Sequence, residues 1–454
     1  MFELSLVEKE ENGFIIKTAI VKYDNCVEEK YIKIPVSEKD FITDTLDPFV
    51  VMNIYKMMRI GGDCYIRGKV NSSLITNLEN FCNSWTVLLP NTYKKINIIA
   101  DEEINDTPKQ LNDDAIMCFS GGLDACYTAY SHFKKLHGRN NKNIKKAIFI
   151  IAEKDLVDNK EHLDLVLKNN KLMLNELNIE FVIIDTNMQH YIDDWMKEYI
   201  SFFASTITLY QKVYHYGLIS SSLLFYDNSS SDSNISFSNI FLGSNNFKII
   251  TAGEFLNRTE KANVIKDWEL ACKYLRVCTG QKYRHKNDCI CEKCQRTILN
   301  FKVCGVKDFP AFPNYSIDLK NIILNKELLF KFYKEILEYN KMTNALEQNE
   351  VNEILDLINR SEIYLGIKSE YDNDKMKEFI NKIAWWIPVK KWRENFRDKF
   401  KIRPDQTRPD QTRPDQTRPD LIYVENTSYF IIIHNIKKYN LRCNIKLQCR
   451  FFVA

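Results

Sequence analysis

Apolar and polar positions follow two different patterns along the chain, with a change near residue 115. Before that point, residues 14–21 and 29–34 show the alternation and β-branched content of strands. Asp47 is expected to cap a helix that begins with Pro48 and ends at Gly61-Gly62. Residues 1–110 are therefore expected to form a small α+β accessory domain, completed by strands at 64–70 and 96–100 and a helix capped by Ser72 or Ser73 that runs to Trp85.

From residue 115 onward, apolar runs of strand length alternate with helical spans. Strands separated by helices predict an α/β fold with a parallel sheet and right-handed crossovers. In such sheets ligands bind at the carboxyl ends of the strands. Residues 111–310 are expected to form this domain, with strands at 116–119, 147–152, 181–185 and 240–242 and helices at 124–136, 162–177 and 191–226.

The rest of the chain is expected to be mostly helical, and no site is expected beyond about residue 400. Residues 311–400 predict a helical segment, with helices at 319–339, 349–359 and 374–386 whose apolar positions recur at core spacing. Residues 401–420 repeat Arg-Pro-Asp-Gln-Thr, and a proline every fifth residue in a polar stretch predicts disorder. The tail at 421–454 has no clear punctuation, and its structure is not predicted.

Composition narrows the class of protein. The 454 residues are 45% hydrophobic and 27% charged, as in a soluble globular protein. The sequence contains neither a signal peptide pattern nor a run of about 18 apolar residues, so no membrane partner is expected. With 13 cysteines in so long a chain, a reducing cytoplasm is the simplest expectation, which makes clustered cysteines candidate metal ligands.

The stretch Ser120-Gly121-Gly122-Leu123-Asp124 joins a predicted strand to a predicted helix. Backbone N–H groups and the helix dipole favour an anion at such a turn, and glycine lets a phosphate approach closely. The spacing differs from that of a Walker A loop. The plainer alternative is an ordinary Gly-Gly turn between a strand and a helix.

This loop resembles that of the ATP pyrophosphatase (PP-loop) superfamily, Ser-Gly-Gly-x-Asp-Ser. The resemblance implies that Ser120, Gly121, Gly122 and Leu123 bind the phosphates of ATP, and that Asp124 acts through Mg²⁺ or pyrophosphate. It also implies attack of a substrate oxygen on the α-phosphorus. Ala125 stands where the family has its second serine.

Four cysteines lie close together in a polar stretch: Cys278, Cys289, Cys291 and Cys294. Thiolates so spaced suit a tetrahedral Zn²⁺ site, which would be structural because four thiolates leave no open position. Cys289 is closer to its neighbour than usual, so either Cys289 or His285 is the fourth ligand, with Cys304 as a weaker candidate. The alternative is a set of free thiols.

A PP-loop followed by four cysteines resembles 7-cyano-7-deazaguanine synthase and its relatives, over residues 115–305. The resemblance implies ATP-site roles for Gly243 and Lys261. The last cysteines are spaced differently from the relatives, and Asn245-Asn246 stands where they have an aspartate-rich segment. The regions on either side have no counterpart in the synthase.

The expected function is that of an ATP-dependent ligase that uses Mg²⁺, with Asp124 and Lys261 as catalytic residues and Zn²⁺ as a structural ion. It would adenylate a carboxylate or amide-type oxygen for attack by a nitrogen or sulfur nucleophile. The acceptor could be a deazapurine-like acid, a nucleotide in RNA or a peptide carboxylate. Alternatives are a nucleotide sensor or scaffold with a degenerate loop, and a tRNA-modifying thiolase. A net charge of +3 argues against extended nucleic-acid contact, and a homodimer or small multi-protein complex is compatible with the helical additions.

Overall fold

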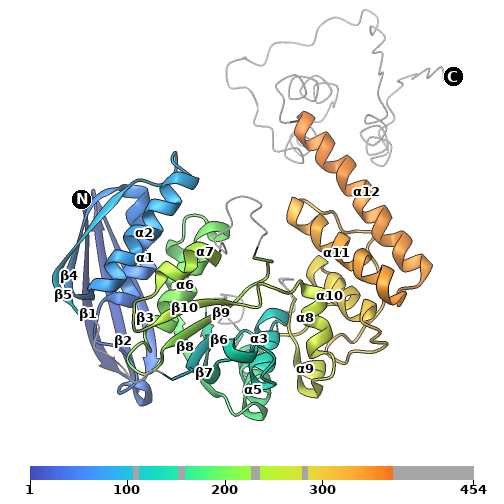
Figure 1. Cartoon of the computed structure of the whole chain (residues 1–454), viewed down its shortest axis with the longest axis horizontal. Coiled ribbons are helices and arrows are strands. Elements are labelled where there is room, and N and C mark those ends of the chain that lie inside the picture. Colours follow the sequence, from blue (N-terminus) through green and yellow to red (C-terminus); the bar gives the residue numbers. More distant parts are fainter. Residues whose placement is uncertain (106–111, 152–158, 226–235, 279–284, 372–454) are drawn as a thin grey trace, which may run out of the picture. The chain divides into compact units, whose positions relative to one another are not determined.

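A computed structural model describes residues 1–105, 112–151, 159–225, 236–278 and 285–371 (Figure 1). The expected helix at 374–386, the repeat at 401–420 and the tail at 421–454 lie outside the described residues.

The chain begins with an antiparallel meander of β1 (Phe2–Glu11), β2 (Phe14–Tyr23) and β3 (Cys26–Pro35). Asn12 and Gly13 both have positive φ, the backbone that a two-residue hairpin turn requires. The predictions at 14–21 and 29–34 are confirmed. The sequence did not predict β1, because its second half is charged and exposed.

Two helices and two further strands complete the N-terminal region: α1 (Asp47–Ile60), β4 (Gly62–Asn71), α2 (Ser72–Leu88) and β5 (Ile96–Ile104). These elements are confirmed, but both predicted caps are wrong. The buried Asp47 carboxylate accepts hydrogen bonds from the Asn71 backbone N–H (2.9 Å) and the Gln211 side chain (2.7 Å) instead of capping α1. Asn71 itself precedes α2 and makes no side-chain cap bond.

From residue 112 onward the described residues contain five strands, with helices between them and after the last of them. The strands are β6 (Asp114–Cys118), β7 (Asn143–Ile151), β8 (Glu180–Thr186), β9 (Tyr216–Ser220) and β10 (Lys248–Ala252). The helices are α3 (Leu123–Phe133), α5 (Lys160–Glu176), α6 (Trp195–Thr208), α7 (Ser236–Asn239), α8 (Arg258–Ile265), α9 (Glu269–Tyr274), α10 (Glu292–Val303), α11 (Glu327–Thr343) and α12 (Gln348–Tyr371).

Two predictions in this region are wrong. The expected helix over 191–226 ends at Thr208, and β9 follows it as a short buried strand. Residues 240–242 form a 3-10 turn, and the strand is β10. Both errors concern apolar runs too short for their period to decide between helix and strand.

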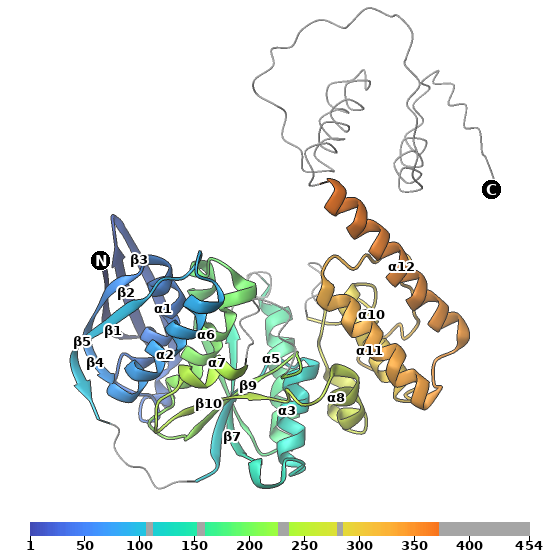
Figure 2. The ribbon, with the colours of Figure 1, turned by 45° about the horizontal axis from the view of Figure 1, so that its top comes forward.

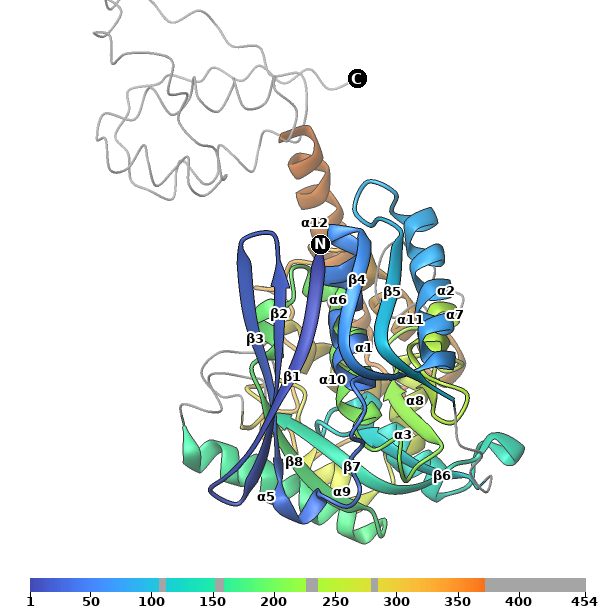
Figure 3. The same ribbon diagram turned by 90° about the vertical axis from the view of Figure 1, so that its left-hand side faces the viewer.

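The described strands form one ten-stranded sheet in the order β10-β9-β6-β7-β8-β3-β2-β1-β4-β5 (Figure 1). Figure 3 shows its strands from β1 to β8 from another side. The neighbours from β10 to β8 are all parallel, as predicted. From β6 the chain moves outward through β7 and β8, then returns to β9 on the other side of β6. The direction of winding therefore reverses between β6 and β9, the place where α/β sheets bind ligands.

The expected N-terminal domain is not a separate body. β3 pairs antiparallel with β8 through Ile32↔Thr186 and Lys33↔Asp185, so the meander extends the same sheet. One hydrophobic core runs from Phe2 to Ile249 across both regions. Residues 1–322 and 326–354 form one compact unit, and the described residues 323–325 and 355–371 belong to a second.

Helices cover both faces of the parallel strands (Figure 2). α3 and α5 lie on one face, where α3 also packs against α8, and α6 lies on the other face beside α1. Within the described residues, no helix is both long and apolar enough to cross a membrane.

Helix α3 contains a buried histidine that gives the stability a pH dependence. Burial, together with the neighbouring His137, lowers the pKa of His132 from its ordinary value of 6.5 to about 3. Its Nδ1 accepts the Lys142 backbone N–H at 3.0 Å, so the neutral ring is required. The unfolded chain therefore takes up a proton between pH 6.5 and 3 that the folded chain does not.

We expect this stabilising contribution to be complete above pH 6.5 and to decline as the pH falls toward 3, by about 2 kcal/mol at pH 5. Urea unfolding at pH 7.5 and 5 measures it. His132→Asn keeps an acceptor near the Nδ1 position and should lose the pH-dependent part. The control, His190→Asn, removes an exposed imidazole and should keep the pH-dependent part of the stability. Equal pH dependence in wild type and His132→Asn would contradict the assignment.

Candidate active site

The loop from 120 to 122 leaves the carboxyl end of β6 and starts α3. Gly121 has a φ of 76°, and a Cβ there would lie 2.3 Å from Oδ1 of the buried Asn170. Gly122 is the N-cap of α3, and its N–H donates to the Ser120 hydroxyl at 3.3 Å. The Arg276 N–H donates to the Gly121 carbonyl at 2.9 Å, which ties the loop to the cysteine-containing segment. The loop thus has the strand–glycine–helix form that the sequence predicts.

Substituting Gly121 separates backbone strain from crowding. Gly121→Ala should lower the free energy of unfolding by about 2–4 kcal/mol, because a left-handed backbone and a displaced Asn170 add together. Gly13→Ala is the matched control, with a φ of 79° and nothing within 4 Å of the new Cβ. It should cost only about 1–2 kcal/mol. Equal losses in urea unfolding would show that Asn170 imposes no constraint.

A cavity of about 270 Å³ lies between the carboxyl ends of β6 and β9. It is therefore located at the reversal of winding identified above. One group of lining residues is polar or charged: Ser120, Asp124, Ser220, Arg258, Lys293, Arg296 and Thr297. The other group is apolar or small: Cys118, Gly122, Leu123, Ala125, Phe203, Ile219 and Val277.

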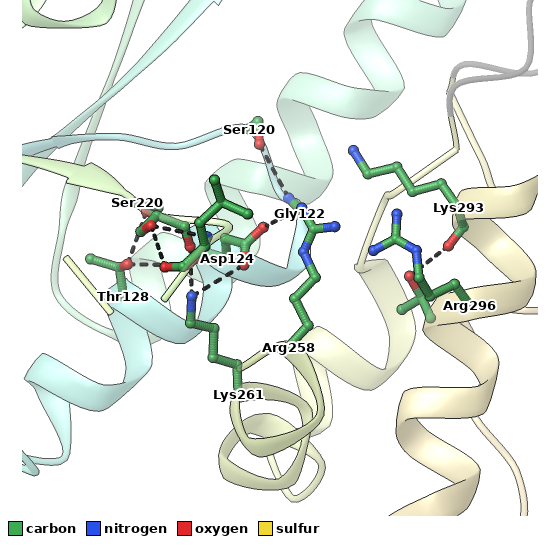
Figure 4. Close-up of polar contacts among 12 residues, drawn as sticks. Ser120, Gly122, Asp124, Thr128, Ser220, Arg258, Lys261, Lys293 and Arg296 are labelled. Carbon is green, nitrogen blue, oxygen red and sulfur yellow. Dashed lines mark hydrogen bonds and ion pairs between the residues drawn. The ribbon is translucent and has the colours of Figure 1, made fainter. Parts of the chain in front are cut away.

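Asp124 is held by two cations from α8. Arg258 contacts its Oδ2 at 3.2 Å and Lys261 contacts its Oδ1 at 3.5 Å (Figure 4). Burial acts to raise the pKa of Asp124, but Arg258, Lys261 and Lys293 outweigh it and hold that pKa below its usual value. Asp124 is therefore a carboxylate at neutral pH.

Lys261 is fully buried, and its ammonium also donates to the Ser221 carbonyl at 2.6 Å. Asn257 and Glu260 form a capping box that fixes the start of α8. The helix thereby holds Arg258 and Lys261, one turn apart, against Asp124.

The opposite wall is the first part of α10. Lys293 and Arg296 extend toward the loop of Ser120 and Gly122 (Figure 4). Glu292 accepts from Arg296 Nε at 2.7 Å, and the Phe332 ring lies 4.5 Å from the Arg296 guanidinium and 4.7 Å from that of Arg258. Burial and the two arginines lower the pKa of Lys293 to about 8. The cavity is thus built to hold an anion.

The structure brings most of the predicted nucleotide-binding residues together. Ser120, Gly122, Leu123 and Asp124 line the cavity, Gly121 shapes the loop, and Lys261 lies behind Asp124. Gly243 does not line it. That glycine lies in a tight turn before β10, where a Cβ would be 2.4 Å from the Phe247 carbonyl oxygen. Since the strand follows this glycine, its position at the carboxyl end of a strand was wrongly inferred.

Sequence reasoning missed Arg258, Lys293 and Arg296 as site residues. A signal existed in α10. Once Cys291 marks the helix start, Lys293, Arg296 and Thr297 fall at helical spacing on one face.

Three of the four predicted metal ligands gather in one place. The ligand atoms of Cys278, Asp288, Cys291 and Cys294 all lie within 4.8 Å of one another. The Cys294 N–H also points to the Cys291 sulfur at 3.4 Å, as expected of a two-residue knuckle. Asn287 fixes the approach of the first cysteine by accepting from the Cys278 N–H at 3.2 Å.

The other candidate ligands lie elsewhere. Cys289 has a φ of 60°, and its thiol points to the Asn287 carbonyl at 3.7 Å. The His285 ring stacks on His162, with centroids 3.6 Å apart. The Cys304 thiol donates to the Thr259 carbonyl at 3.4 Å. Asp288 takes the fourth position that the sequence assigned to Cys289 or His285.

Comparison with known proteins gives little beyond a weak structural similarity. Neither a protein-family model nor a curated protein matches the chain. Among solved structures, the chain is similar to the U34-tRNA thiolase NcsA from Methanococcus maripaludis with its [4Fe-4S] cluster. The identity is 15% and the TM-score 0.25, over 64% of this chain and 80% of that one. A TM-score this low gives no information about the chemistry of this chain.

Proposed function

We propose that the chain is an ATP-dependent adenylating enzyme that releases pyrophosphate. The observation that carries the proposal is the placement of Arg258, Lys293 and Arg296 around a glycine loop at the reversal of winding. Among the described residues that line the cavity, Asp124 supplies the negative charge that these cations face. The cavity volume of about 270 Å³ lies just below the usual range of about 300–1,000 Å³ for ligand pockets. A cavity of this size suits a phosphate chain better than a whole nucleotide.

In the proposed reaction an acceptor oxygen attacks the α-phosphorus of ATP. The bond between the α-phosphorus and the bridging oxygen breaks, and pyrophosphate leaves with that electron pair. A nitrogen or sulfur nucleophile then attacks the activated carbon, loses its proton and displaces AMP. The charge on the departing pyrophosphate would be stabilised by Arg258, Lys293 and Arg296. The glycine loop would hold the triphosphate of ATP in line for attack.

The residues present fit a magnesium ion bound with the nucleotide. Mg²⁺ in such sites is held by one or two carboxylates together with substrate phosphates. Asp124 is ionised, and its side chain is 20% exposed. Magnesium would supply further charge neutralisation at the phosphates.

The cysteine group fits a single Zn²⁺ ion. Sulfurs bound to zinc at about 2.3 Å in a tetrahedron lie about 3.8 Å apart, and the Cys278 and Cys291 sulfurs are separated by 3.9 Å. Asp288 would complete the set with an oxygen ligand. Ligand atoms this close suit one ion rather than a cluster of several metals. The ion would be structural and would fix the start of α10.

The test is pyrophosphate release from ATP and Mg²⁺ across carboxylate, deazapurine and nucleobase acceptors. Lys293→Met should weaken ATP binding about tenfold or more, because it removes a cation facing the phosphates. The matched control, Lys168→Met, removes an exposed lysine of α5 and should leave binding unchanged. Failure of the wild type to bind ATP would refute the proposal.

A second candidate function is a nucleotide sensor. It is favoured by Ala125 in the loop and by the engagement of both Asp124 oxygens with Arg258 and Lys261. ATP binding without acceptor-dependent pyrophosphate release would support the sensor over the enzyme.

A further inference from the structure

Three aromatic side chains along α6 form a cluster that reaches from the protein surface to the cavity. The Trp195 and Tyr199 ring centroids lie 6.1 Å apart, those of Tyr199 and Phe203 lie 6.0 Å apart, and those of Trp195 and Phe203 lie 6.4 Å apart. Phe203 lines the cavity, whereas Trp195 is 44% exposed. We call these three residues the α6 aromatic cluster.

The fold places this cluster at the edge of the sheet where the ligand site lies. α6 precedes β9 and packs against β6 and β9, so it runs back toward the amino ends of those strands. Its first turn, with Trp195, is therefore on the side of the carboxyl ends. Phe203 meets the strand end directly, since the Cys118 thiol points to the Phe203 carbonyl at 3.9 Å.

The cavity wall around Phe203 is the apolar one. Cys118 and Ile219 line it beside Phe203, whereas Arg258, Lys293 and Arg296 come from α8 and α10. A ligand with one anionic end and one flat apolar part would therefore meet complementary surfaces in the same site.

We propose that the α6 aromatic cluster is a stacking subsite for the planar heterocycle of a ligand whose anionic part lies among the cations. This inference rests on the proposed anion site for the charged end only. Core packing accounts for Phe202, which is 2% exposed and packs against Trp195 and Phe203, but it does not account for the 44% exposure of Trp195, whose ring neighbours the Phe203 ring of the cavity lining. Aromatic faces bind any nucleobase, because each base presents a π-surface.

Two sources could supply the heterocycle: the adenine of ATP, or the ring of an acceptor. Calorimetry with four probes distinguishes them: ATP, inorganic tripolyphosphate, adenosine 5′-monophosphate and guanosine 5′-monophosphate. The variant is Trp195→Leu, with Trp195→Phe as the conservative replacement. Phe133→Leu is the matched control, because Phe133 is also 44% exposed and lies at the far end of α3.

If adenine occupies the subsite, Trp195→Leu should weaken ATP about tenfold or more and leave tripolyphosphate unchanged. If an acceptor ring occupies the subsite, the affinity of Trp195→Leu for ATP should be unchanged. Its affinity for one of the two monophosphates should fall about tenfold or more. In either case Trp195→Phe should retain most of the wild-type affinity. The bound ring should also quench the tryptophan fluorescence of Trp195, a signal that the wild type has and Trp195→Phe lacks.

Unchanged affinity of Trp195→Leu for every ring-containing probe would overturn the subsite, as would a wild type that binds none of them. Failure of the anion site has a different signature, because tripolyphosphate would not bind the wild type while the ring-dependent quenching would persist.

Discussion

Asp124→Asn is expected to abolish acceptor-dependent pyrophosphate release and to destabilise the fold. The asparagine keeps the shape but removes the charge that faces Arg258 and the fully buried Lys261. Leaving a buried cation without its partner costs about 3–5 kcal/mol. Turnover should fall by about 10²–10³-fold or more, since the loss of one well-placed electrostatic group has that effect. Urea unfolding and a pyrophosphate assay measure the two effects separately.

A double variant separates stability from chemistry. Asp124→Asn/Lys261→Met removes both charges of the buried pair, so it should recover part of the lost stability without recovering turnover. Glu269→Gln is the control for the charge change, because Glu269 is an exposed carboxylate of α9 that pairs with Lys273 and does not line the cavity. Pyrophosphate release by Asp124→Asn at the wild-type rate would exclude Asp124 from the reaction.

The loop could be predicted because its signal is local. A short apolar strand, two glycines and a helix start occupy one continuous stretch, and Gly121 adopts the positive φ that such a turn needs. The parallel sheet followed from alternating strands and helices in the same way. Both predictions required only neighbours in the sequence.

The cations around the loop could not be predicted from local signals. Arg258 reaches Asp124 across 134 positions, and nothing in its own segment distinguishes it from a solvent-exposed arginine. The N-terminal region shows the same limit. Its strands were predicted, but their union with the parallel sheet depends on two residue pairs between β3 and β8 that no local pattern encodes. The ligand group contains Asp288 and not Cys289, and Cys289 has a positive φ of 60° that no local pattern predicts.

The cysteine group and the cavity are linked through α10, and this link predicts a large effect of metal removal. Cys291 caps the helix and Cys294 lies in its first turn, next to Lys293 and Arg296. Purified protein should contain one zinc ion per chain. Chelation should remove stabilisation on the order of 10 kcal/mol from this segment, because binding energy at a structural zinc site is folding energy. With the helix start released, tripolyphosphate affinity should fall at least about tenfold.

Two neighbouring substitutions test which residues hold the ion. Asp288→Asn should weaken zinc binding, since it replaces a charged oxygen ligand, whereas Cys289→Ser should retain the full metal content because that thiol points to the Asn287 carbonyl. Cys294→Ser should lose both the metal and the anion affinity. Metal analysis and calorimetry measure the two quantities. Metal loss in Cys289→Ser but not in Asp288→Asn would restore the four-cysteine site that the sequence predicts. Loss of metal without loss of tripolyphosphate binding would mean that α10 holds Lys293 and Arg296 in place on its own.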